Sequence, residues 1–147
     1  MAKLTPEARE LLGARNMAHL ATLMADGSPH VSPVWVGIEG DHLAIFSTAP
    51  HLKVRNMRRD GRVAISVCDE HNPYRAVLIR GWVVEEIEGP AAVEIMDRIS
   101  NRYVGTDFPV RTAIVSFIEP ERVHYQELPF THEAHPDESS ASPAPPG

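Results

Sequence analysis

The sequence is dominated by short β-type runs joined by tight turns, and this pattern restricts the fold more than any other feature. Segments 17–23, 29–38 and 42–48 are predicted as strands because they are rich in apolar and β-branched residues. The linkers Ala25-Asp26-Gly27-Ser28 and Glu39-Gly40-Asp41 have the composition of hairpin turns. Strands joined in this way pair antiparallel, whereas a parallel sheet needs a long crossover between consecutive strands.

The rest of the chain continues the pattern and inserts short helices. Further strands are predicted at 62–69 and 76–88, with one or two closing strands at 111–128 and a loop at 71–75. Helices are predicted from Thr5 to Gly13, over 51–59 and over 91–105. The pattern therefore predicts a mainly β (α+β) fold, a closed or split antiparallel barrel, because barrel closure removes exposed sheet edges.

Length and composition predict one domain followed by a tail. The 147 residues carry a net charge of −6, and 43% are hydrophobic. We expect the folded domain to span 1–130. Residues 131–147 are rich in Pro, Ser, Ala and acidic residues and lack periodicity, so they are predicted to be disordered.

Several classes of protein are disfavoured by the same sequence. The N-terminus lacks the apolar core of a signal peptide, and no apolar run approaches the roughly 18 residues of a membrane span. The acidic balance disfavours nucleic acid as a partner. A cytoplasmic enzyme or binding protein is therefore expected. Cys68 is expected to be a small core residue, and His19, His30 and His42 to be structural or surface residues. No metal site is predicted.

The stretch "STAPHLKVRNMRRDGRVAIS" (47–66) concentrates five cations, which suit a nucleic-acid patch, a solvated helix face or a phosphate site. At about 100° per residue, the cations spread around the predicted helix and do not form one nucleic-acid face. Lys53 and Asn56 fall side by side at the start of this helix, after Ser47-Thr48. Backbone N–H groups, an ammonium, an amide and two hydroxyls would suit a phosphate there. On spacing alone, a solvated helix is still the favoured interpretation.

Several short motifs follow one another along the chain: Pro33-Val34-Trp35-Val36, Phe46-Ser47-Thr48, Lys53 with Asn56, "RRDGRVAISV" (58–67), "RGWVV" (80–84) and "IEPERVHY" (118–125). In this order they resemble those of the pyridoxamine-phosphate-oxidase-like split-barrel flavoproteins. The chain looks most similar to the branch that uses the deazaflavin coenzyme F420.

This resemblance implies a six-stranded antiparallel split β-barrel of the FMN-binding type with short flanking helices. It also implies a homodimer with cofactor sites at the subunit interface. Lys53, Asn56, Ser47 and Thr48 would hold the cofactor phosphate, and Arg55 would assist. Pro33, Val34 and Trp35 would present backbone and an apolar face to the cofactor ring.

The implied function is an F420-dependent oxidoreductase that transfers a hydride between reduced F420 and a small conjugated organic substrate. The alternatives are an FMN-dependent oxidase or reductase, and a non-catalytic flavin-, deazaflavin- or haem-binding protein. No catalytic residue is evident, which agrees with chemistry carried by a cofactor. Tyr74, Arg75 and Arg80 are candidates for proton donation.

Overall fold

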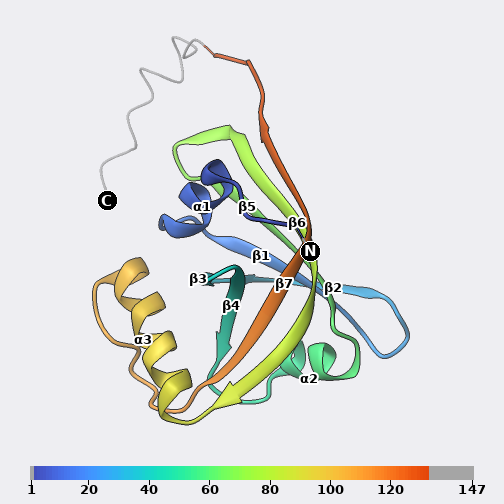
Figure 1. The fold of residues 1–147 in the computed structure, drawn as a ribbon, viewed down its shortest axis with the longest axis vertical. Helices are drawn as coiled ribbons and strands as arrows, with labels where there is room; N and C mark the ends of the chain where they lie inside the picture. The colour runs from blue at the N-terminus through green and yellow to red at the C-terminus, as the bar shows by residue number, and fades with distance from the viewer. Residues whose placement is uncertain (1, 133–147) are drawn as a thin grey trace, which may run out of the picture.

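The computed structural model of the protein describes residues 2–132, in which one curled antiparallel sheet forms a split barrel (Figure 1). The strand order across the sheet is β2-β1-β5-β6-β7-β4-β3. From residue 133 onward, the predicted disordered tail lies outside the described residues. The strands are β1 (Ala18–Leu23), β2 (Pro29–Val34), β3 (Gly37–Glu39), β4 (His42–Ser47), β5 (Arg62–Asp69), β6 (Asn72–Glu88) and β7 (Ile114–Glu127); the helices are α1 (Pro6–Gly13), α2 (Leu52–Arg59) and α3 (Pro90–Val104).

The mainly β, antiparallel fold predicted from the turn pattern is confirmed, with seven strands within 2–132 where the family resemblance implied six. The extra strand arises because the predicted strand 29–38 breaks at Trp35 and Val36 into β2 and β3. The predicted loop at 71–75 is wrong: the turn is short, and Asn72 already pairs with Asp69 at the start of β6. Residues 111–113 precede the closing strand and do not belong to it.

Two hydrophobic cores hold the elements together. The barrel interior contains alternate residues of the central strands, including Leu20, Ile65 and Ile79, and is closed by α1. The second core lies between α3 and the outer side of β4 and β7, around Met96. Cys68 lies in neither core, contrary to the prediction, because Val63, Ile65 and Val67 occupy the inner positions of β5 and Cys68 falls on the outer side.

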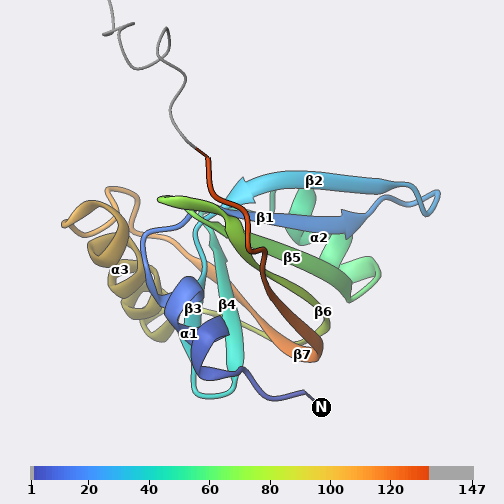
Figure 2. The same cartoon turned by 90° about the horizontal axis from the view of Figure 1, so that it is seen from above.

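The helices lie at different sides of the barrel. In Figures 1 and 2, α3 lies on the side opposite the tip of the β1–β2 hairpin, and α2 lies beside that hairpin. None of the helices within 2–132 has the length and apolar composition to cross a membrane.

The two longest strands, β6 and β7, cross closely at Gly81. A Cβ atom at this position would lie 2.3 Å from the backbone oxygen of Glu119, so a side chain cannot be accommodated without moving backbone. The register of the β6–β7 pair shifts at the same point, between Arg80 and Gly81. This irregularity bends the long strands and helps the sheet to curl.

The ends of the sheet are the strands β2 and β3. On β2, Pro29, Val31 and Pro33 are exposed on the outer side of the sheet. His30, Ser32 and Val34 alternate with them and face the barrel interior.

Candidate functional site

Helix α2 places a lysine on its buried face. Val54 and Met57 anchor the helix in the protein, as the sequence predicts, and Asn56 is also fully buried. At about 100° per residue from Leu52, these three side chains span an arc from about 40° to about 200°. Lys53 lies near 100°, in the middle of that arc. Its ammonium is therefore held against the protein and does not extend freely into solvent.

Lys53 is partly buried and forms no ion pair or hydrogen bond with any residue between 2 and 132. Burial lowers the pKa of its ammonium below the ordinary value of 10.5, and no carboxylate in the described part of the chain offsets this effect. A cation in this position favours the binding of an anion, because the anion would restore the lost solvation of the charge.

The neighbouring cations are engaged elsewhere. Arg58 forms an ion pair with Glu86 at 2.8 Å, and Arg62 forms one with Asp60 at 2.7 Å. The Arg62 guanidinium and the Arg62 backbone N–H lower the pKa of Asp60 to about 2. The stretch 47–66 therefore does not present one basic patch.

Two more arginines of this stretch contact backbone. Arg59 donates to the carbonyl of Leu23 at 3.2 Å. Arg55, the predicted helper of Lys53, is exposed and donates to the carbonyl of Pro50 at 3.4 Å. The guanidinium of Arg55 is thus drawn toward the loop that precedes α2.

The side chain of Asn56, which was expected to bind the cofactor phosphate, forms hydrogen bonds within the protein. Its amide donates to Thr22 Oγ1 at 3.1 Å and to Met24 Sδ at 3.4 Å, and its oxygen accepts from Arg59 at 3.2 Å. These bonds attach α2 to the end of β1. The fully buried and engaged amide of Asn56 therefore positions the helix that carries Lys53.

Ser47 and Thr48, the other predicted phosphate ligands, end strand β4. Ser47 is 4% exposed and shares the inner face of β4 with Leu43 and Ile45. Its Oγ is buried without a hydrogen-bond partner among the described residues. Such an orphaned group costs about 1–3 kcal/mol, so it is a candidate for binding a ligand. Thr48 accepts a hydrogen bond at its carbonyl from Thr112 Oγ1 at 2.9 Å.

Two polar groups on β2 were not predicted from the sequence. His30 Nδ1 and Ser32 Oγ are both buried without a hydrogen-bond partner in the part of the chain described. Both face the barrel interior, like Ser47. The alternating sequence of β2 could have indicated that His30 and Ser32 lie on one face of the strand. It could not have indicated that they lack hydrogen-bond partners.

The residues expected to contact a ring lie in three different surroundings. Pro33 is exposed on the outer face of β2, and Val34 is part of the barrel core. Trp35 leaves the strand and stacks on Tyr103, with ring centroids 5.1 Å apart and planes 8° apart. Phe46 and Phe108 contact the same indole edge-on. Trp35 therefore packs against the α3 core through its ring.

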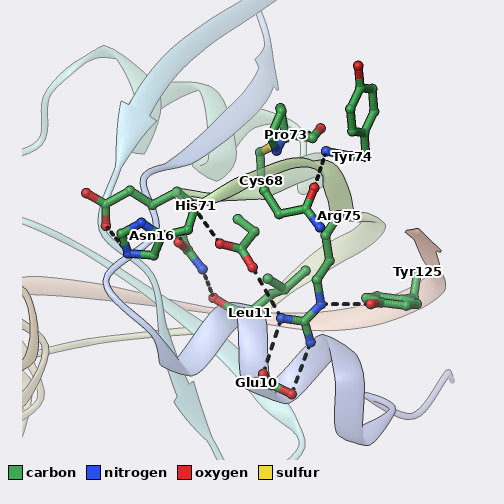
Figure 3. A network of polar contacts seen from close by, with 12 residues as sticks. Glu10, Leu11, Asn16, Cys68, His71, Pro73, Tyr74, Arg75 and Tyr125 are labelled. Carbon is green, nitrogen blue, oxygen red and sulfur yellow. Dashed lines mark hydrogen bonds and ion pairs between the residues drawn. The ribbon is translucent and has the colours of Figure 1, made fainter. Parts of the chain in front are cut away.

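The three candidate proton donors lie in different surroundings on β6. Figure 3 shows Arg75 between Glu10 and Tyr125, with the Arg75–Glu10 ion pair at 3.0 Å and the bond to Tyr125 Oη at 2.8 Å. The hydrogen bond to Glu10 contributes most to the raised pKa of Arg75, so the guanidinium stays charged. The ion pair of Arg75 with Glu10 connects α1 to the sheet. Tyr74 stacks on His132 and hydrogen-bonds to it. Arg80 is exposed on the outer side of the sheet, directly opposite Arg122.

Comparison with known proteins gives one family and several related folds. The family model for pyridoxamine 5'-phosphate oxidase matches residues 4–127. A solved structure named F420 reductase is 28% identical, with 79% of this chain and 94% of that chain covered and a TM-score of 0.70. No curated protein sequence matches the chain significantly.

Two further structures resemble the fold. The conserved hypothetical protein Rv2991 from Mycobacterium tuberculosis is 21% identical, covering 92% of this chain and 97% of that chain, with a TM-score of 0.74. An FMN-binding protein from Syntrophomonas wolfei is 13% identical, covering 85% and 87%, with a TM-score of 0.66.

Proposed function

We infer that this chain, which belongs to the pyridoxamine 5'-phosphate oxidase family, is an oxidoreductase that uses the deazaflavin coenzyme F420. The observation that carries this proposal is Lys53 on the buried face of α2, which has no ion-pair partner among residues 2–132. A phosphate-bearing cofactor would supply the missing anion. The orphaned Oγ of Ser47 fits the same group, because a hydroxyl can donate a hydrogen bond to a phosphate oxygen.

The residues near Lys53 suit binding better than proton transfer. Lys53 and Ser47 would hold the phosphate, and Asn56 and Met57 would keep α2 in place through buried contacts. When bound in its reduced form, F420 supplies a hydride, which an activated C=C or C=N bond of a small conjugated substrate can accept. The protein then needs to orient the ligands and exclude water, and solvent can supply the accompanying proton.

F420 is preferred over FMN on two grounds. The solved F420 reductase is 28% identical to this chain, whereas the FMN-binding protein is 13% identical and bears on the fold alone. Arg55 in the middle of α2 and Arg59 at its end also have no carboxylate ion pair among residues 2–132, and they suit the anionic tail of F420.

We further propose that the protein is a homodimer whose interface is the outer face of β1, β2, β5, β6 and β7. Val31 is 64% exposed on this face, Leu78 43% and Trp82 45%. A hollow of about 800 Å³ lies over the same strands, with Arg80 and Arg122 on its wall. Glu121 lines the same hollow, so the wall of this face carries charges of both signs that a second subunit could complement. A two-fold partner can provide both apolar cover and complementary charges.

The test is binding and turnover by the purified protein. We expect F420 to bind with micromolar affinity or better, and more tightly than FMN. Reduced F420 should be consumed when a panel of enones is added, and this is followed by the absorbance of oxidised F420. A protein that is purified yellow with FMN and ignores F420 would favour an FMN-dependent enzyme. Tight F420 binding without turnover of any acceptor would favour a carrier.

A further inference from the structure

The inner face of the edge strand β2 carries two unpartnered polar groups close together in space. His30 and Ser32 are two residues apart on one strand, so their side chains lie on the same face, about 7 Å apart. Their buried atoms, His30 Nδ1 and Ser32 Oγ, have no hydrogen-bond partner among residues 2–132. The third inward residue, Val34, packs in the core and needs none.

Register places His30 next to the helix that carries Lys53. His30 is directly opposite Thr22 on β1, and Thr22 accepts the hydrogen bond from Asn56 of α2 at 3.1 Å. Paired residues have Cβ atoms about 5 Å apart on the same face. Residues three apart on a helix are similarly close, so Lys53 lies beside Asn56 within about 6 Å. The long side chain of Lys53 can therefore share a ligand with His30.

The chemistry of these groups indicates the charge of the ligand. A serine hydroxyl, a neutral imidazole with its proton on Nδ1, and an ammonium can all donate hydrogen bonds. A cation would be repelled by Lys53, and an apolar ligand would leave all three groups without partners. An anion with several acceptor oxygens would bind to all three, and a phosphate has this geometry.

We propose that His30 and Ser32 form the second wall of the anion site whose first wall is Lys53, and that His30 donates a hydrogen bond from Nδ1 to a phosphate oxygen of the bound ligand. This rests on the proposed function, because the phosphate belongs to the cofactor inferred above. The site then extends from α2 across the end of β1 to the free strand β2.

The experiment compares FMN with riboflavin, which lacks the phosphate, in the full-length protein. The variants are His30→Ala and Ser32→Ala, and the matched control is His71→Ala, because His71 is exposed in the β5–β6 turn. We expect each site variant to weaken FMN binding about tenfold, the effect of one lost charge-assisted hydrogen bond, and to leave riboflavin binding unchanged. The control should match the wild type for both ligands.

Unchanged FMN affinity in His30→Ala would overturn the proposal, and so would an equal loss for FMN and riboflavin. A His30→Asn variant separates a lost hydrogen bond from a lost fold, because its amide nitrogen occupies nearly the position of Nδ1 and can still donate. We expect it to restore part of the FMN affinity.

A second measurement is independent of the cofactor. If the wild type does not bind FMN, the anion site is tested with inorganic pyrophosphate. Binding of neither FMN nor F420 would also refute the proposed function. We expect the imidazole resonances of His30, identified by their loss in His30→Asn, to shift on titration with pyrophosphate in the wild type. In Lys53→Met the shift should be much weaker. The absence of a shift in the wild type would overturn the site itself.

Discussion

Replacement of Lys53 by methionine is the most informative perturbation of this protein. Methionine keeps most of the aliphatic length of the side chain but removes the charge. A charge-assisted hydrogen bond to phosphate contributes about 1.5–3 kcal/mol, so F420 and FMN should bind about 10- to 150-fold more weakly. Fluorescence titration at two ionic strengths measures this loss, which should be smaller at high salt because the wild-type interaction is screened.

The same substitution should raise the stability of the protein without ligand. Burial lowers the pKa of Lys53 below 10.5, so in the window between the lowered pKa and 10.5 the unfolded chain binds more protons than the folded one. Wild-type stability therefore rises with pH through that window. In Lys53→Met this rise should be absent, and at neutral pH the apo variant should melt at a higher temperature than the wild type.

The control is Lys3→Met, which has the same change in net charge at the exposed N-terminus. It should alter neither cofactor affinity nor the pH dependence of melting. If Lys53→Met binds both cofactors as tightly as the wild type, the phosphate assignment is refuted. If affinity falls but the apo protein also melts lower, the loss reflects damage to α2, and the reasoning from burial of the charge is wrong.

Three further predictions concern the barrel. Gly81→Ala should reduce the free energy of unfolding, measured by calorimetry, by about 1–3 kcal/mol or more, because its Cβ would meet the backbone oxygen of Glu119. The control Gly13→Ala has open space around its Cβ and should have little effect. Leu78→Glu should convert the proposed dimer to a monomer in sedimentation experiments; a wild-type protein that is monomeric at micromolar concentration would contradict the assigned interface. The carboxyl resonance of Asp60 should titrate with a pKa of about 2. The contribution of ionised Asp60 to the free energy of unfolding is therefore complete above pH 4 and is lost as the pH falls toward 2. An Asp60 pKa near its ordinary value of 3.8 would exclude the Arg62 interaction in solution.

Features of the fold that depend on local chemistry were predictable from the sequence. The hairpin turns at Gly27 and Gly40 have backbone φ angles of 85° and 64°, which glycine adopts without strain, and both turns were identified from their composition. Helix α2 was identified from its apolar spacing, which also placed Val54 and Met57 on its buried side. These features need only neighbouring residues to be recognised.

Features that depend on tertiary contacts were not predictable. The helical projection of residues 51–59 predicts that Asn56 is adjacent to Lys53. It does not predict that the Asn56 amide donates to Thr22 at the end of β1, because that contact joins distant parts of the chain. Cys68 ends an apolar run in which inner and outer positions look alike, so its exposure depends on strand register. That His30 Nδ1 and Ser32 Oγ lack hydrogen-bond partners among the described residues depends on which groups surround them in the fold, and no sequence motif encodes this.

The prolines of β2 also limit how the protein can assemble. A proline cannot donate to a strand ladder, so the bonds of β2 to β1 use the N–H groups of His30 and Ser32, and Pro29, Val31 and Pro33 face the free edge. Along this edge, Val31 is therefore the one N–H donor between Pro29 and Pro33. This scarcity of donors disfavours extension of the sheet by strand addition at β2, so a second copy of the protein is more readily received on the outer face than along this edge.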